Sequence, residues 1–516
     1  MPFGSVRTTC TAGAAARRAA ILLAAALLGP LAAGAAVAAE ASAAVEAPLR
    51  VETRHQGRFG GKSVRYVARA AEMQLTNAAG EPAAAMYYTA YLAEDGGPDR
   101  PVSFVFNGGP GSASMWLHMG LLGPKRVVVP SDADADDGAA PYRVIDNADT
   151  ILDLTDLVFI DPIGTGFSRV IGEGDSADYW SMEGDTASIS QFIRRFVTEE
   201  HRWNAPKYLI GESFGTTRAA AVADALMGDG QDTALNGIVM VSQAMDYTGS
   251  SPAADNLIAY VTYLPTMAAT ARYHGRAGTD VPLADWVAAA RAFATDEYLP
   301  ALFRGSALPA AERQRIAERH AEFTGLSVAY VLRADLRVTV PRFTKELLRD
   351  QGLAVGRLDG RYTADEADDT ADQPHLGDPA SNAVSSAFTA AFNAYLGKEL
   401  GVEPARPYLT SNREVGSNWN YRPVPLGRSW EPSYVNTARS LSDALRKNGD
   451  LNVLVANGYY DLVTPFFDAE YTLGRHGILP ERVRMTYYEG GHMMYLHQSD
   501  FDALLEDIRA FYVDGR

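Results

Sequence analysis

Three short apolar runs in this chain stop directly at glycine-rich turns, and this pattern limits the possible folds more than any other feature. VSFVF (residues 102–106) leads into NGGPGS, DLVFID (residues 156–161) into PIGTGFS, and KYLI (residues 207–210) into GESFG. Short continuous apolar runs are typical of strands that helices cover on both faces. The sequence therefore predicts an α/β fold with a mostly parallel central sheet flanked by helices.

Further periodic segments extend this sheet on both sides of a long interruption. Residues 63–77 and 83–95 are predicted strands, and residues 189–196 repeat apolar side chains at helical spacing. The strand pattern lapses near residue 250 and resumes at residues 451–461 and 483–492, before a last predicted helix. An interrupted sheet that is completed later implies an insertion packed over the strand ends.

The chain has 516 residues, which exceeds the roughly 300 residues at which a single hydrophobic core stops growing. We therefore expect one large domain with an inserted unit. Residues 40–250 and 431–516 are assigned to the two parts of the core, and residues 251–430 to a cap insertion. The cap is expected to be largely helical, because apolar residues between 388 and 396 share one helical face.

Residues 1–39 have the pattern of an export signal. Arg7, Arg17 and Arg18 precede an apolar run from Ala19 to Leu28, and small residues follow it. The run is shorter than the ~20 residues of a membrane-spanning helix, so we expect removal and no stable membrane anchor. The paired arginines leave a twin-arginine signal open as an alternative. The expected location is exported, either periplasmic or secreted.

Composition excludes several classes of protein. The only cysteine, Cys10, lies in the predicted signal, so disulfides, thiolate catalysis and cysteine metal ligands are excluded for the mature chain. A net charge of −17 leaves no basic face for nucleic acid. No cofactor or metal cluster is visible in the sequence, and the oligomeric state stays open.

Ser213 is a candidate nucleophile. It lies in GESFGTT, a Gly-x-Ser-x-Gly pattern between the predicted strand KYLI and a helix-compatible alanine-rich stretch. A serine presented at a sharp strand-to-helix turn needs small neighbours, and Gly211 and Gly215 meet that requirement. The hydroxyl becomes nucleophilic only when a base removes its proton.

His492 and Asp461 are the candidate partners of this serine. His492 follows a late predicted strand in EGGHMM, and Asp461 ends another strand through NGYYD. The chain order Ser, Asp, His is that of α/β-hydrolases and differs from the chymotrypsin and subtilisin orders. Asp468 is the alternative acid, and His497 is expected to face solvent.

NGGPGS, after the early strand, can bring a backbone N–H group close to a reacting oxygen, because adjacent glycines allow a close approach. Phe214, directly after Ser213, would supply a second N–H group. Together they form a candidate oxyanion hole.

Four blocks of this chain resemble the serine carboxypeptidase family, peptidase family S10. They are FVFNGGPGSAS, LVFIDPIGTGFS, GESFGTT and EGGHMM, in this order. The resemblance implies an α/β-hydrolase fold with a cap domain, and peptide substrates with a free C-terminus. Because the mature chain has no cysteine and an export signal precedes it, a bacterial member of the family is expected.

The resemblance also implies roles for single residues. The catalytic triad would be Ser213, Asp461 and His492, with the oxyanion hole formed by the N–H groups of Gly109 and Phe214. Asn107 and Glu212 would bind the C-terminal carboxylate of a peptide. A glutamate that faces a carboxylate must carry a proton, so peptide hydrolysis is expected to fall in alkali while simple esters are still cleaved.

The chain departs from many relatives at four places near this site. Val105 replaces a tryptophan and Ser112 a cysteine, Leu121 and Leu122 stand where many relatives have an acidic residue, and Met494-Tyr495 replace a common Val-Pro. The triad is intact, whereas the acidic partner of Glu212 is missing. Two other functions stay open, namely another α/β-hydrolase activity such as an esterase, aminopeptidase or acyltransferase, and a catalytically silent binding protein.

Overall fold

The computed structural model describes residues 47–133, 135–228, 230, 232–251, 253–422 and 433–515. The predicted export signal, residues 1–39, lies outside the described residues. Within the part of the chain that is described, no helix is both long enough and apolar enough to cross a membrane.

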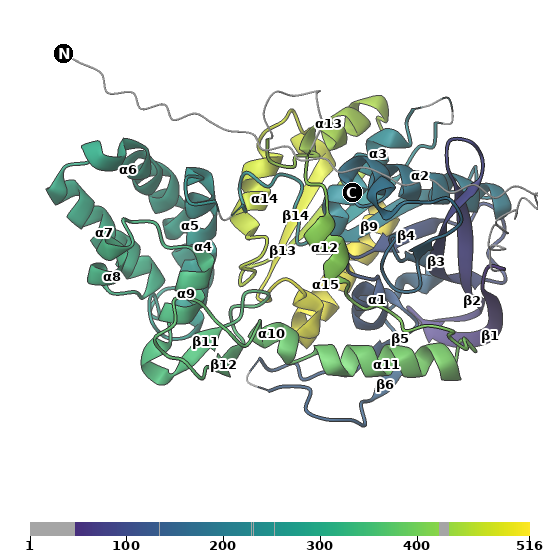
Figure 1. The fold of residues 1–516 in the computed structure, drawn as a ribbon, viewed down its shortest axis with the longest axis horizontal. Coiled ribbons are helices and arrows are strands. Elements are labelled where there is room, and N and C mark those ends of the chain that lie inside the picture. Colours follow the sequence, from purple (N-terminus) through teal and green to yellow (C-terminus); the bar gives the residue numbers. More distant parts are fainter. Residues whose placement is uncertain are drawn as a thin grey trace, which may run out of the picture. The chain divides into compact units, whose positions relative to one another are not determined.

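A ten-stranded sheet forms the centre of the molecule, and Figure 1 shows helices on both of its faces. In spatial order its strands are β1 (Arg50–Phe59), β2 (Lys62–Thr76), β3 (Pro82–Ala93), β7 (Asp156–Ile160), β4 (Val102–Phe106), β9 (Lys207–Glu212), β10 (Gly237–Val241), β13 (Asn452–Gly458) and β14 (Val483–Tyr488), with β8 (Arg169–Val170) paired to β3.

The six strands from β7 to β14 run parallel, whereas β1, β2 and β3 are joined in antiparallel register. Every residue of β4, β7 and β10 is buried, which explains why these segments are continuous apolar runs. The predicted α/β fold with a mostly parallel sheet is confirmed. The edge strand β1 was not predicted, because its residues alternate between exposed and half-buried positions and include many polar side chains.

Two layers of helices cover the sheet. One layer packs against the hydrophobic cluster that contains β4, β9 and β13, and consists of α2 (Met182–Glu199), α3 (Phe214–Ala225), α13 (Ala438–Lys447) and α14 (Phe466–Leu473). The other layer consists of α1 (Met115–Leu117), the π-turn η1 (His118–Leu122), α11 (Ser385–Lys398), η8 (Met494–Leu496) and α15 (Gln498–Asp514).

The segment between β10 and α13 is mostly helical. Its helices are α4 (Leu257–Tyr273), α5 (Leu283–Phe293), α6 (Leu299–Arg304), α7 (Ala310–Thr324), α8 (Val328–Arg333), α9 (Val340–Glu346), α10 (Pro379–Asn382), α11 and α12 (Arg413–Asn418). Helices α4 to α9 share a hydrophobic cluster of their own, whereas α11 packs into the main core, where Phe388 lies 5.0 Å from Trp116 between ring centroids. The boundaries 251–430 for a cap stay a prediction.

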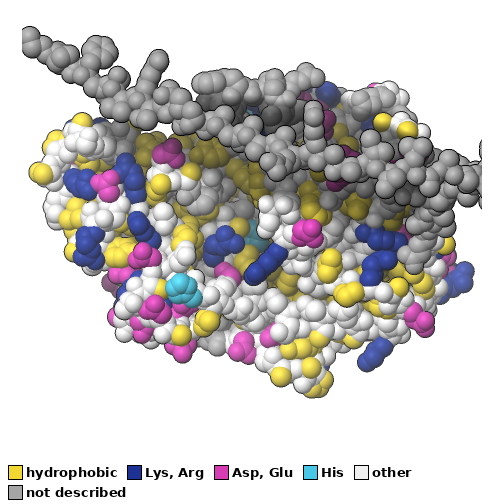
Figure 2. All heavy atoms as spheres, in the orientation of Figure 1, with side chains coloured by type: hydrophobic (Ala, Val, Ile, Leu, Met, Phe, Trp, Pro, Cys, Tyr) yellow, Lys and Arg dark blue, Asp and Glu magenta, His cyan; other side chains and the backbone are white. Residues whose placement is uncertain are grey.

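The remaining elements are short. They are the hairpins β5 (Lys125–Val127) with β6 (Val144–Asp146) and β11 (Leu353–Val355) with β12 (Thr363–Asp365), and the turns η2 (Ile151–Asp153), η3 (Ser176–Asp178), η4 (Ala294–Tyr298), η5 (Gly305–Ala307), η6 (Arg349–Gln351) and η7 (Pro480–Arg482). Acidic and basic side chains are interspersed on the face that Figure 2 shows.

Candidate active site

Ser213 lies at a sharp turn between β9 and α3. Its φ of 59° and ψ of −128° place a non-glycine residue in a region that costs of order 1–3 kcal/mol. Added Cβ atoms at Gly211 and Gly215 would come within 3.0 Å of Thr216 N and 2.7 Å of Phe106 O, respectively. The two glycines therefore allow the strained turn, which leaves the Ser213 side chain half-buried at the edge of the sheet.

His492 and Asp461 form a hydrogen-bonded pair. His492 Nδ1 lies 2.8 Å from Asp461 Oδ2, and both side chains are buried. Asp461 also accepts the N–H groups of Val463 and Thr464 on Oδ1, and the Thr464 hydroxyl on Oδ2 at 2.7 Å. These bonds hold the carboxylate in place, so that it engages Nδ1 and leaves Nε2 of His492 for proton transfer.

The surroundings of His492 make it a stronger base than an ordinary histidine. Burial lowers the pKa of His492, but the charge and hydrogen bond of Asp461, together with the nearby Glu212, raise that pKa above its ordinary value. Arg357 opposes part of this rise. The imidazole therefore takes up a proton readily, as a general base must.

Ser213 and His492 are both attached to the end of β10. The Ser213 N–H group donates to the Val241 carbonyl at 3.0 Å, and the hydroxyl of the next residue, Ser242, donates to the His492 carbonyl at 2.7 Å. The structure thus brings the predicted nucleophile and the His–Asp pair to the same edge of the sheet.

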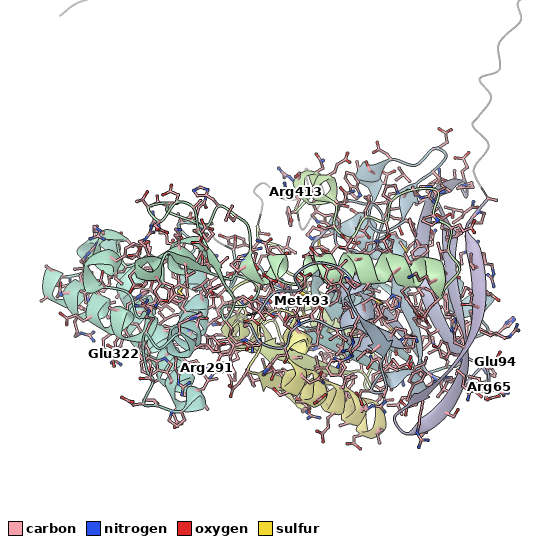
Figure 3. All side chains as sticks on the ribbon, turned by 90° about the horizontal axis from the view of Figure 1, so that it is seen from below. Arg65, Glu94, Arg291, Glu322, Arg413 and Met493 are labelled. Carbon is pink, nitrogen blue, oxygen red and sulfur yellow. The ribbon has the colours of Figure 1, made fainter. Side chains whose placement is uncertain are left out.

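A segment of the insertion, residues 356–361 (GRLDGR), contacts the loops that carry Asp461 and His492, and we call it the brace. The His492 N–H group donates to the Leu358 carbonyl at 2.6 Å, and the Leu462 N–H group donates to the Arg357 carbonyl at 3.0 Å. The brace therefore ties the residue after Asp461 to the histidine loop. Met493, next to His492, lies between the helices of the insertion and the sheet in Figure 3.

The brace also contacts the histidine loop through a side chain. Asp359 Oδ2 accepts the Gly491 N–H group at 3.0 Å, and the buried Arg361 guanidinium lies 2.6 Å from the same oxygen. An added Cβ at Gly491 would collide with Asp359, so this contact requires glycine at position 491.

The NGGPGS loop lies directly over the start of α3. An added Cβ at Gly108 would collide with Phe214 N and would lie 2.9 Å from Gly215 N, so only glycine allows this approach. Gly109 has a φ of +104°, which a side chain would strain. The Phe214 N–H group is one of the first in α3 and has no partner within the helix. The NGGPGS loop therefore lies next to the Ser213 turn, and an oxyanion hole formed by the N–H groups of Gly109 and Phe214 stays a prediction.

Glu212 directly precedes Ser213, and its buried carboxyl lies close to Asn107. Burial raises the pKa of Glu212 to about 7, although His492, Tyr495 and Asn107 each lower it. The Tyr495 hydroxyl donates to Glu212 Oε2 at 2.7 Å. Near pH 7 this buried carboxyl therefore exists in both protonation states.

Asn107 is held rigidly and still has a free donor. Its Oδ1 accepts the Leu117 N–H group at 3.0 Å, and its carbonyl accepts Arg218 Nη1 at 2.6 Å. Arg218 is fixed in turn by the buried Asp185 carboxylate at 2.7 Å. Asn107 Nδ2 is buried and makes no hydrogen bond of normal geometry with a described residue, although it lies close enough to Glu212 to lower the pKa of that carboxyl.

The two alternatives from the sequence lie elsewhere. Asp468 is buried in α14, where burial and the charge of Asp246 raise its pKa, and within the described residues its hydrogen bonds do not include His492. His497 is about one-third exposed and pairs with Asp500 at 3.0 Å, at the start of α15.

Sequence reasoning did not identify Thr464, the brace or Tyr495 as parts of this site. Thr464 and Tyr495 each lie three residues after a predicted triad member, which is a usable local signal. The brace carries no such signal, because only its tertiary contacts relate it to the site.

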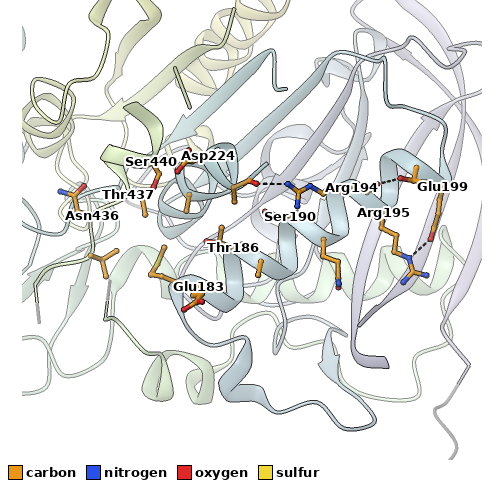
Figure 4. Close-up of a pocket in the computed structure, with 17 residues that line it drawn as sticks. Glu183, Thr186, Ser190, Arg194, Arg195, Glu199, Asp224, Asn436, Thr437 and Ser440 are labelled. Carbon is orange, nitrogen blue, oxygen red and sulfur yellow. Dashed lines mark hydrogen bonds and ion pairs between the residues drawn. The ribbon is translucent and has the colours of Figure 1, made fainter. Parts of the chain in front are cut away.

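A large hollow of about 1120 Å³ lies between α2, α3 and α13 (Figure 4). Arg194 crosses it and donates to the Ala225 carbonyl at 3.0 Å. None of the predicted site residues lines this hollow, so its size does not make it the candidate site.

The parallel sheet, the serine turn and the His–Asp pair define an α/β-hydrolase. The family model for serine carboxypeptidases (Peptidase_S10) matches residues 71–269, a segment that includes Asn107, Glu212 and Ser213. The resemblance to serine carboxypeptidases is thereby confirmed, and it supports hydrolase activity. Asp461 and His492 lie beyond the matched segment.

A solved structure of a carboxypeptidase shares this fold. Kex1(delta)p, a prohormone-processing carboxypeptidase from Saccharomyces cerevisiae, matches with a TM-score of 0.54 and 15% identity, over 87% of this chain and 91% of its own. A proline iminopeptidase from Mycobacterium smegmatis is 13% identical, with a TM-score of 0.34 over 86% of this chain and 100% of its own. No curated protein matches the chain.

Proposed function

We propose that this protein is a serine-type carboxypeptidase that releases single residues from the C-termini of peptides. One observation carries the proposal. A buried carboxyl with a pKa near 7, Glu212, and the free Asn107 Nδ2 donor lie directly beside the strained Ser213 turn. A neutral acid and an amide N–H group together can receive one carboxylate.

The first half of the proposed reaction forms an acyl-enzyme. Ser213 Oγ attacks the carbonyl carbon of the last peptide bond while His492 Nε2 takes its proton. The N–H groups of Gly109 and Phe214 stabilise the oxyanion, and Asp461 stabilises the imidazolium. His492 then protonates the leaving amino group, the C–N bond breaks, and the free amino acid departs.

The second half hydrolyses the acyl-enzyme. A water molecule gives a proton to His492 Nε2 and attacks the ester carbonyl. Collapse of the second tetrahedral intermediate breaks the bond to Ser213 Oγ, which recovers a proton from His492. The shortened peptide leaves with a new C-terminal carboxylate.

The protonation states required by this reaction differ between substrates. A peptide acid requires Glu212 protonated and His492 neutral, whereas an ester without a carboxylate requires only neutral His492. Because Glu212 and His492 interact, the state with the proton on Glu212 competes with the state in which His492 holds it. A bound substrate carboxylate disfavours ionised Glu212, and so favours the productive state.

The test is hydrolysis of an N-blocked dipeptide acid beside its C-terminal amide and ester, from pH 4 to pH 9, by wild type and Ser213→Ala. We expect faster cleavage of the acid than of the amide below the pKa of Glu212, and no activity in the variant. Activity confined to the ester or amide would assign the triad to another hydrolase reaction. Equal rates in wild type and Ser213→Ala would exclude Ser213 as the nucleophile.

Export belongs to the same proposal, because an exopeptidase of this kind would meet peptides in the periplasm or medium. Fractionation of cells that express the full chain, with and without residues 1–39, tests it. A mature protein found only in the cytoplasm would contradict export and leave the reaction unaffected.

A further inference from the structure

The acidic residue that pairs with the site glutamate in many serine carboxypeptidases is absent from this chain, where Leu121 and Leu122 occupy that position in η1. The structure brings a phenol to Glu212 instead. Tyr495 belongs to η8, lies 283 positions from Glu212 in the chain, and donates its hydroxyl to Oε2 at 2.7 Å.

The Tyr495 ring reaches Glu212 by packing over the glycine that precedes Leu121. An added Cβ at Gly120 would lie 2.5 Å from the ring and 3.2 Å from Phe388. Tyr495 is 2% exposed, and its hydroxyl is therefore held within a packed environment. The neighbouring Arg126, which lines a small cavity beside the ring, is engaged with Gln498 at 2.7 Å.

Tyr495 donates in this bond, and its phenol keeps the proton that it donates over the physiological pH range. Burial, followed by the charge of Glu212, raises the pKa of Tyr495 well above its ordinary value, so that the phenol keeps its proton. Among the described residues, Glu212 Oε2 is the acceptor to which this hydroxyl bonds. The phenol proton is directed at Oε2, so the proton of a neutral Glu212 is favoured on Oε1.

Besides burial, which raises the pKa of Glu212, the groups that act on this carboxyl come from three segments of the chain. The charge of His492, the hydrogen bond of Tyr495 and the nearby Asn107 amide lower the pKa, whereas the charge of Asp461 raises it. Tyr495 can be removed from this set without touching the reacting atoms.

We propose that Tyr495 is a positioning residue of the carboxylate subsite: it directs the Oε1 hydroxyl of Glu212, together with Asn107 Nδ2, toward the C-terminal carboxylate of a peptide. The inference rests on the proposed function. It gives the Tyr495 phenol the role that an acidic partner of the site glutamate has in many relatives. A hydroxyl that donates to Glu212 stabilises the ionised form, so it also sets the pH above which free-acid peptides are rejected.

The experiment measures binding instead of turnover. The affinities of N-blocked phenylalanyl-leucine and of its C-terminal amide are determined by calorimetry from pH 4 to pH 9, in Ser213→Ala and in Ser213→Ala with Tyr495→Phe. In the first protein we expect the acid to bind more tightly than the amide below pH 7 and to lose this advantage as Glu212 ionises.

Tyr495→Phe keeps the ring over Gly120 and removes only the donor. We expect about three- to tenfold weaker binding of the acid at pH 5, because the Glu212 proton is no longer directed to Oε1. We also expect the alkaline loss of binding to move up by about one pH unit, because ionised Glu212 has lost a hydrogen bond. Binding of the amide should not change.

Tyr488→Phe is the matched control. Tyr488 is buried at the end of β14, and its hydroxyl also donates to a carboxylate, Asp507 Oδ2, at 2.7 Å. It should leave both profiles unchanged. Glu212→Gln should abolish the loss of acid binding at alkaline pH, since an amide does not ionise.

The outcomes separate this inference from the proposed function. Equal changes in acid and amide binding, or an unshifted alkaline loss, would overturn the role of Tyr495. A Tyr495-dependent preference for the acid, in an enzyme whose wild type does not cleave that peptide, would sustain the subsite and overturn the carboxypeptidase reaction.

Discussion

Two of the histidine–aspartate pairs among the described residues are separated by nearly equal distances, and only one of the two has the surroundings expected of a catalytic site. His492 Nδ1 lies 2.8 Å from Asp461 Oδ2, and His476 Nε2 lies 2.9 Å from Asp246 Oδ2. The side chain of His492 is 5% exposed and that of His476 is 17% exposed.

The pairs differ first in the ring nitrogen that contacts the carboxylate. Asp461 engages Nδ1, which leaves Nε2 of His492 for exchange with a serine hydroxyl. Asp246 engages Nε2 of His476, and Asn436 Nδ2 lies 3.3 Å from the same nitrogen. Nε2 of His476 is thus already bonded.

They differ next in their neighbours. The backbone of His492 is bonded to Ser242 and Leu358, which relate it to the Ser213 turn and to the brace. His476 follows α14 and has a φ of 57°. A close His–Asp contact is therefore insufficient to identify a base, whereas the ring nitrogen used and the elements that hold the loop distinguish the two pairs.

The largest expected effect comes from removing each histidine in turn. His492→Ala should lower kcat by about 10⁴- to 10⁶-fold, because it removes the proposed base for the Ser213 proton. His476→Ala should leave kcat near that of the wild type. Ester hydrolysis and fluorophosphonate labelling of Ser213 measure both. A comparable loss of kcat in the two variants would contradict the assignment of His492, and not His476, as the base.

The aspartates should repeat this contrast with a smaller loss. Asp461→Asn is expected to lower kcat by about 10⁴-fold, because an amide at this position favours the wrong tautomer of His492. Asp246→Asn is the matched control and should retain activity. If Asp461→Asn were fully active, Asp461 would have no role in orienting the imidazole.

The brace predicts a further loss that involves no reacting group. Gly491→Ala introduces a Cβ that collides with Asp359, so the His492 loop must move. A displacement of about 1 Å can cost roughly 10²-fold in kcat. Gly397→Ala in α11 is the control, because the nearest atom to its added Cβ is 4.0 Å away. An undiminished kcat in Gly491→Ala would show that the brace does not position His492.

The smallest expected effect is a difference in pH dependence between substrates. Ester hydrolysis should fall as the pH drops through the raised pKa of His492, because the base becomes protonated. Hydrolysis of a peptide acid should show this loss and also fall as the pH rises through about 7, where Glu212 ionises, by up to tenfold per pH unit. Parallel profiles for the two substrates would contradict the role of Glu212.

Much of the core fold could be predicted because its signals are local. VSFVF and KYLI are buried on both faces, and their apolar runs match β4 and the first part of β9. The glycines around Ser213 are required by contacts within the turn, so the pattern itself carries their steric reason. The strand β1 was missed because its half-exposed residues produce no such run.

The site was only partly predictable, because some of its residues follow recognisable strand patterns whereas others reach it only through tertiary contacts. Ser213, Asp461 and His492 each follow a predicted strand, and the structure brings the aspartate and histidine into contact; their catalytic roles stay predictions. Asp359 contacts the histidine loop from the insertion and is itself paired with Arg361, and no local sequence pattern indicates that contact.

The sequence alone determined the parallel α/β core and the order of the three candidate catalytic residues, because burial on both faces and tight turns leave patterns within a few residues. Tertiary structure decided which nitrogen of His492 meets Asp461, which segment contacts the loops of these two residues, and which hydroxyl donates to Glu212. Tyr495 and Glu212 are 283 positions apart. A hydrogen bond over that separation depends on how the sheet, η1 and η8 pack together, and such packing is a property of the whole fold.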